Sequence, residues 1–150
     1  MKTAFRRFAL LGAAIMAGVA AYVSFTPDAA ADNDQIGILS LATRTANTNS
    51  ATLVNERHRG VVIHVDVDAV VGGGSVDCAV QALDPTSATW IAIAGASTGA
   101  KTAGAYELVV YPGVTETANL DVSRPLPKKW RVVATVVTSA TFSVAGSYVD

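Results

Sequence analysis

The sequence has little of three things on which protein chemistry often depends: cysteine, histidine and charge. Its single cysteine excludes a disulfide within the chain and a cysteine-based zinc cage, and its 2 histidines leave little for any other metal site. Charged residues make up 15% of the chain, against about 25% in ordinary soluble domains. The net charge of -1 provides no broad field for phosphate backbones, so nucleic acid is not an expected partner.

Apolar residues, in contrast, are plentiful. They account for 51% of the 150 residues, which excludes a disordered tail or a charged array and is enough to build a core. A chain of this length is typical of one domain, so no second core is expected.

Residues 1–31 form an apolar N-terminal segment. Three basic residues precede an uncharged run from Phe8 to Phe25, and small residues follow up to Ala31. This pattern is typical of a secretory signal cleaved after Ala31, but it also fits an uncleaved membrane anchor or an apolar helix packed within a protein assembly. Contact with a membrane is expected only if the segment is uncleaved and inserted.

The next segment, residues 32–58, is polar and rich in small side chains. Its apolar residues are confined to a short patch between Ile36 and Leu41. We therefore expect an extended polar arm with one short strand.

From residue 59 to residue 150, alternation with a period of two dominates. Between Arg59 and Val71, the valines and Ile63 at odd positions form an apolar face, while His64 and two aspartates lie on the other. The glycines at 72–74 interrupt this strand, and the alternation resumes after them, which predicts a hairpin.

Turn signals separate the expected strands that follow. Asp84-Pro85-Thr86-Ser87 and Pro112-Gly113 are typical turn sequences. Strands are expected at 90–94, 106–111, 130–136 and 142–148, a loop at 95–104, and a connection at 114–129 that crosses the edge or end of the sheet. No segment after Asp32 shows a helical period, so we predict an all-β fold, an antiparallel β-sandwich or small barrel preceded by the arm and the N-terminal apolar helix.

One interpretation of the polar face is a metal site. His64, Asp66 and Asp68 lie at alternate positions, and a strand would project them from one face, where an imidazole and two carboxylates could bind a divalent cation. A solvated strand face gives the same pattern and is the interpretation we favour. No metal and no cofactor are therefore predicted.

The sequence does not favour a catalytic interpretation either. Nothing in the sequence places a serine beside His58 or His64, and no Gly-Lys-Ser/Thr follows the glycines at 72–74, so neither a hydrolase triad nor a phosphate loop is expected. Cys78 lies on an apolar face, where a thiol acts as a small hydrophobe. No catalytic residue is predicted.

Two binding surfaces stay open. Trp90 and Trp130 are expected in the core, with a platform for a carbohydrate as the alternative. The basic residues between Arg124 and Arg131 fit either a solvated strand entry or a contact with an acidic partner.

Several strings, taken together and in order, resemble a group of small structural proteins of tailed bacteriophages, the capsid decoration and minor head proteins. The strings are Ala42-Thr43-Arg44-Thr45-Ala46-Asn47-Thr48-Asn49-Ser50, Arg59-Gly60-Val61-Val62-Ile63-His64-Val65-Asp66-Val67, Ala82-Leu83-Asp84-Pro85, Tyr106-Glu107-Leu108-Val109-Val110-Tyr111-Pro112-Gly113 and Leu126-Pro127-Lys128-Lys129-Trp130-Arg131-Val132.

The resemblance spans about residues 41–149 and implies a β-sandwich without an active site. It implies a virion protein that decorates or stabilises a capsid through the arm and the sandwich, with the major capsid protein and further copies of itself, in trimers for example, as partners. The alternative is a secreted β-sandwich module, cleaved near Ala31, that binds a glycan or a cell-surface partner.

Overall fold

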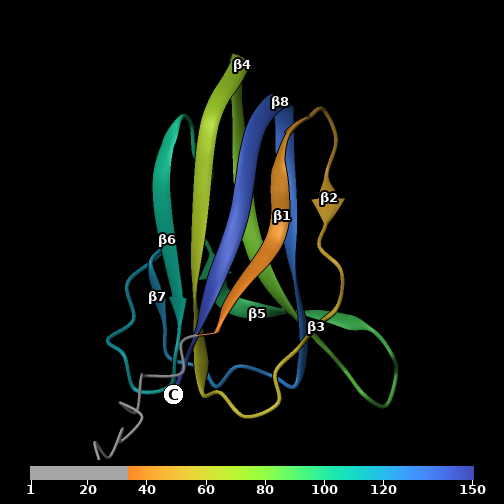
Figure 1. Cartoon of the computed structure of the whole chain (residues 1–150), viewed down its shortest axis with the longest axis vertical. Coiled ribbons are helices and arrows are strands. Elements are labelled where there is room, and N and C mark those ends of the chain that lie inside the picture. Colours follow the sequence, from red (N-terminus) through yellow and green to blue (C-terminus); the bar gives the residue numbers. More distant parts are fainter. Residues whose placement is uncertain (1–33) are drawn as a thin grey trace, which may run out of the picture.

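The computed structural model describes residues 34–150, and every regular element in that range is a strand (Figure 1). This confirms the all-β prediction for the described residues. The signal, anchor and helix predictions for residues 1–31 fall outside this range. Within 34–150, no helix is long and apolar enough to cross a membrane.

Eight strands form one sheet, with the order β1-β8-β4-β6-β7; β2 and β3 pair with β8, and β5 pairs with β4. All pairs are antiparallel except β6 with β7, so the sheet is mixed and the expectation of a purely antiparallel one was wrong. The strands are β1 (Gln35–Arg44), β2 (Thr48–Asn49), β3 (Leu53–Val54), β4 (Gly60–Leu83), β5 (Trp90–Ser97), β6 (Gly104–Val110), β7 (Asp121–Val122) and β8 (Lys129–Val149).

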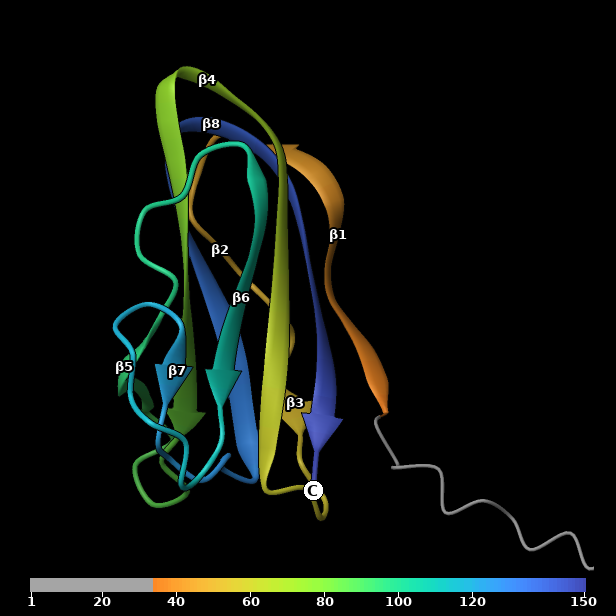
Figure 2. The ribbon, with the colours of Figure 1, turned by 90° about the vertical axis from the view of Figure 1, so that its left-hand side faces the viewer.

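The long strands β4 and β8 run side by side and bend together at one end of the molecule (Figure 2). At the bend, Val71 pairs with Ser139 and Ser75 with Val137, so three glycines of β4 oppose Thr138 of β8. Two of the glycines have positive φ, as does Thr138 at 65°. The glycines thus change the direction of the chain, but β4 continues through them, so the expected interruption of the strand was wrong.

The predicted hairpin at these glycines was nevertheless wrong. The two halves of β4 do not pair with each other, because β8 lies alongside both of them. The expected strands at 130–136 and 142–148 are likewise the two halves of the single bent strand β8.

The bend folds the sheet into two layers (Figure 2). The first layer contains β1, β6 and the halves 60–71 of β4 and 139–149 of β8. The second contains β2, β3, β5 and the halves 75–83 and 129–137. The layers share one apolar core, and Tyr148 of the first touches Trp130 of the second edge to face, with ring centroids 6.1 Å apart.

The segment expected as an arm with one short strand contains three strands, all paired with β8. β1 alone has ten residues, of which only Ile38 is buried. Because β1 lies at the end of the sheet, it needs little apolar alternation, and its sequence therefore resembles an unpaired segment.

The turn expected at Asp84 is confirmed by its contacts. The Asp84 carboxylate accepts hydrogen bonds from the Ser87 hydroxyl at 2.6 Å and the Thr86 backbone N–H at 2.9 Å. These two bonds lower the pKa of Asp84, the hydroxyl having the larger effect.

Candidate functional site

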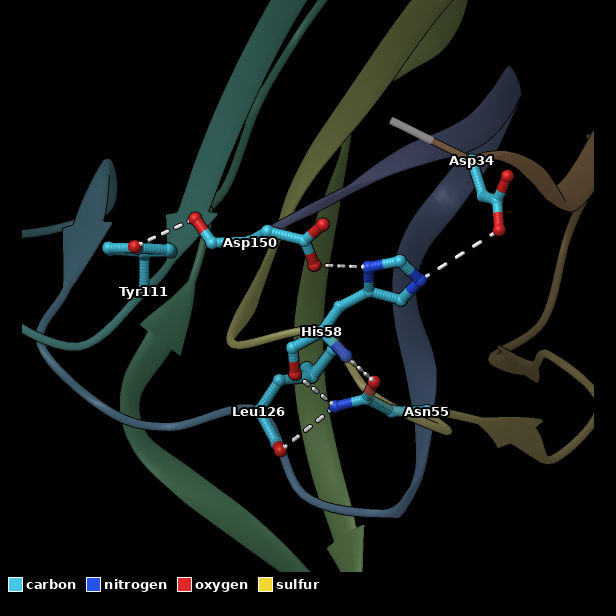
Figure 3. Close-up of polar contacts among 6 residues, drawn as sticks. All are labelled: Asp34, Asn55, His58, Tyr111, Leu126 and Asp150. Atoms are coloured by element: carbon cyan, nitrogen blue, oxygen red, sulfur yellow. Dashed lines mark hydrogen bonds and ion pairs between the residues drawn. The ribbon is translucent and has the colours of Figure 1, made fainter. Parts of the chain in front are cut away.

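The most connected polar group surrounds the loop between β3 and β4, at the end of the molecule opposite the bend (Figures 1 and 3). Asn55 is buried there and fixes the loop. Its side-chain N–H groups donate to the backbone oxygens of His58 at 2.7 Å and Leu126 at 3.2 Å, and its Oδ1 accepts the His58 backbone N–H at 2.8 Å. Both polar atoms of the Asn55 side chain are therefore satisfied.

His58 lies between two carboxylates (Figure 3). Its Nδ1 is 2.7 Å from Oδ1 of Asp150, and its Nε2 is 3.8 Å from Oδ2 of Asp34. The imidazole, only 5% exposed, stacks on the Tyr148 ring with a centroid distance of 4.7 Å. The Tyr111 hydroxyl donates to the backbone oxygen of Asp150 at 2.9 Å. We call Asp34, Asn55, His58 and Asp150 the His58 junction.

The His58 junction joins the residue before β1, the loop before β4 and the residue after β8. A histidine bonded to an aspartate is also half of a hydrolase triad, but the triad needs a nucleophile on the other ring nitrogen. In the described chain, the ion-pair partner of Nε2 is the Asp34 carboxylate, at 3.8 Å. The arrangement therefore fits a structural role, in which His58 connects distant parts of the chain. No serine is paired with His58 in the described residues.

The polar strand face expected around His64 exists, but it does not gather a metal site. His64, Asp66 and Asp68 are all exposed on the outer side of β4, and the nearest acidic neighbour of His64 is Glu107 of β6, 3.7 Å from Nδ1. Residues 34–150 hold no group of three or more His, Cys, Asp or Glu residues that could bind a metal ion. Alternate residues of a strand are about 6.5 Å apart, which separates the three side chains along β4.

Cys78 lies in the core, as its apolar face predicts. Its side chain is 1% exposed. Burial, reinforced by the Asp77 carboxylate and opposed by Arg44, raises the pKa of the thiol to about 12. The reactive thiolate is therefore suppressed at neutral pH.

The two tryptophans differ. Trp130 is completely buried, which excludes it as a carbohydrate platform; its Nε1 has no acceptor among the described residues. Trp90 is half-buried at the surface, where the Arg131 guanidinium lies 4.4 Å from its ring centroid. Arg131 also donates from Nε to Oε1 of Gln81 at 2.9 Å. One face of the Trp90 ring is thus covered by a cation.

The basic stretch from Arg124 to Arg131 divides between a loop and a strand. Arg124 and Lys128 lie in the connection before β8, whereas Lys129 and Arg131 alternate with the buried Trp130 and point outward from the second layer. Because the register pairs Arg131 with Gln81, and Leu83 with Trp90, these side chains share one surface. We call Leu83, Gln81, Trp90, Lys129 and Arg131 the basic face.

Arg44 makes a structural contact that the pattern of the sequence did not reveal. Its guanidinium donates to the backbone oxygens of Ser40 at 2.8 Å, Phe142 at 2.9 Å and Ala42 at 3.1 Å, and lies 4.6 Å from the Phe142 ring centroid. It occupies carbonyl groups at the bulge where β1 departs from regular pairing with β8. An added strand would compete with Arg44 for these oxygens, so this part of the edge is protected.

The bend itself forms an apolar end of the molecule. Val71 of β4 is 61% exposed and Val137 of β8 is 52% exposed. No charged residue occurs from 69 to 76 or from 132 to 149. We call Val71, the glycines 72–74 and the residues 136–138 the apex.

No protein-family model matches the chain, and no curated protein matches it in sequence.

Proposed function

We propose that this protein is a non-enzymatic structural protein of a tailed-phage virion, carried in several copies on the capsid and bound to the major capsid protein. The resemblance to capsid decoration and minor head proteins supports this proposal. The strings that carry the resemblance cover the end of β1 together with β2, the first half of β4, the end of β4 with the turn at Asp84, β6 with its following turn, and the start of β8. They are therefore framework segments of the fold.

The finer fold assignment belongs to the same proposal. Two layers with a shared core and almost exclusively antiparallel pairs have the features of a β-sandwich. A sandwich turns its strand bends and loops toward its ends, where a partner can contact them without disturbing the core.

The apex is the observation that carries the docking proposal. Val71 and Val137 each expose more than half of their surface on neighbouring strands, within a stretch that has no charge to desolvate. Burying such an apolar surface against a protein lattice yields about 1 kcal/mol for each valine. A weak contact of this size is sufficient when many linked copies bind the same particle.

The apex takes the place of the arm in this proposal. The strands of the segment 34–58 already pair with β8, so one side of each strand is engaged within the chain. Removing that segment would also remove Asp34, Asn55 and His58, and with them the His58 junction. An arm deletion would thus disturb the fold together with any docking.

The test is binding of the full chain to capsid particles that lack it, measured by co-sedimentation. The double variant Val71→Lys with Val137→Lys places two charges on the apex and should weaken particle binding more than about tenfold. Ile91→Lys is the matched control, because Ile91 is 54% exposed on β5, away from the bend; its binding should stay unchanged.

Equal binding of the apex variant and the wild type would overturn the proposed docking site. Absence of particle binding by the wild type, together with retention on a glycan array, would overturn the virion function and support the secreted binding module.

A further inference from the structure

The two layers present outer faces of opposite charge. On the first layer, Asp66, Asp68 and Glu107 are exposed around His64, and no lysine or arginine shares their surface in the register of β4, β6 and β8. We call these four residues the acidic face. On the second layer, the basic face carries Lys129 and Arg131. Asp77 lies on the same side of β4, where its carboxylate already accepts a hydrogen bond from the Ser97 hydroxyl at 2.6 Å.

The charges of both faces are largely without partners inside the chain. The side chains of Asp66, Asp68 and Lys129 make no hydrogen bond or ion pair with another residue of the described range, and the Glu107 carboxylate reaches only the exposed His64, at 3.7 Å. Arg131 contacts a neutral amide and a ring. Each face therefore offers its charge to a partner.

The uncharged residues beside the two faces are also suited to a contact between them. Val62 and Val109 pair across the first layer beside the acidic face, and Ala79 and Val133 pair across the second layer beside the basic face. All four are only partly buried. A contact between the faces would place small apolar side chains against each other and leave the charges as pairs around them, as in ordinary protein interfaces.

We propose that the acidic face of one copy binds the basic face of a second copy of this chain. The occupant is a second copy because the chain itself carries both complementary faces, on opposite sides of the same core. Such a contact joins two different surfaces, so it is heterologous and links copies head to tail, forming a ring where the rotation closes.

This inference deepens the proposed function by naming the lateral neighbour of each copy on the capsid. The charge-based contact uses neither the apex nor any capsid residue. It can therefore be tested with the purified full chain in the absence of particles, and a failure of one proposal is distinguishable from a failure of the other.

The test is a charge exchange measured by sedimentation velocity at about 0.02 M salt, where surface charges are least screened. One variant combines Lys129→Glu with Arg131→Glu, and the other combines Asp66→Lys with Glu107→Lys. Each variant alone should associate at least about tenfold more weakly than the wild type, because its two faces then carry like charges. An equimolar mixture should regain association, because the reversed faces are complementary to each other.

The control variant combines Lys101→Glu with Arg124→Glu, which makes the same change in net charge as Lys129→Glu with Arg131→Glu but outside both faces, and it should associate like the wild type. Lys129→Glu and Asp66→Lys, made singly and mixed, repeat the test without removing the contact of Arg131 with Trp90. Recovery in either mixture supports the proposal. A wild type that stays monomeric, or a mixture that regains no association although both variants are folded by circular dichroism, would overturn it.

Discussion

At the scale of single residues, two polar side chains fasten parts of the chain that are far apart in sequence. Arg44 binds the backbone of Phe142, and His58 binds the side chain of Asp150. Both therefore connect the β1–β3 region or the loop before β4 with the second half of β8. Hydrogen bonds to charged groups contribute about 1.5–3 kcal/mol, so these two side chains hold the edge of the sheet and its closing end.

Neither contact could be predicted from the sequence. The alternation of apolar and polar residues predicts which side chains of a strand are buried. The prediction is confirmed for Val61, Ile63, Val65 and Val67. The partners of Arg44 and His58, in contrast, come from a strand about ninety residues away, and nothing local in the sequence marks them. His58 could therefore be weighed only as half of a triad.

Cys78 supports a prediction about alkaline pH. The folded state holds the thiol pKa at about 12, whereas the thiol of the unfolded chain has a pKa of about 8.5. Below the pKa of the unfolded chain, the thiol is protonated in both states, so the free energy of unfolding is not reduced by its titration. As pH rises above it, the unfolded state loses its proton first, so the free energy of unfolding falls by about 1.4 kcal/mol per pH unit until the folded state also titrates.

Urea unfolding at pH 8 and pH 10 measures this effect, with Cys78→Ala as the control. Between the two pH values, the wild type should lose about 2 kcal/mol more than the variant. The cavity left by the variant lowers its stability at both pH values and cancels in the comparison. Identical losses would show that the thiol titrates alike in the two states.

At the scale of elements, the bend of β4 and β8 determines the fold. A Cβ at Gly74 would lie 2.6 Å from the backbone oxygen of Val137 and 2.9 Å from those of Ser139 and Val71. Backbone atoms cannot move aside as a flexible side chain can, so Gly74→Ala should destabilise the protein by more than about 2 kcal/mol.

Gly37→Ala is the matched control, because no atom lies within 4 Å of a Cβ at Gly37 in β1. Its free energy of unfolding should change by less than about 0.5 kcal/mol. The two variants differ only in position, so chemical denaturation separates the requirement of the bend from the general cost of replacing glycine in a strand. Equal stability of the two would contradict the close packing at Gly74.

The bend also shows how much of a strand and its pairing can be predicted from the sequence pattern. The glycines at 72–74 predicted a change of direction, and the chain turns there. The partner of the strand was missed, since a hairpin and a shared bend of two strands have the same local signal: alternation, glycines, alternation. Thr138, which has positive φ in β8 opposite these glycines, carries no turn signal at all.

At the scale of the whole molecule, the folded sheet separates three surfaces: an uncharged apex, an acidic face and a basic face. The sequence alone indicated the acidic strand positions and the basic stretch before Arg131, but it could not place them on opposite sides of one core. That separation depends on the bend, which turns the second halves of β4 and β8 away from the first. A molecule with these surfaces can bind a capsid lattice through the apex and contact neighbouring copies through its two charged faces.

The most direct test of a structural role on the capsid is intact-mass spectrometry of the native protein in purified virions and in the culture supernatant. Our account predicts the chain in the virion fraction, in several copies for each particle. A chain that begins at Asp32, found only in the supernatant and absent from particles, would contradict it.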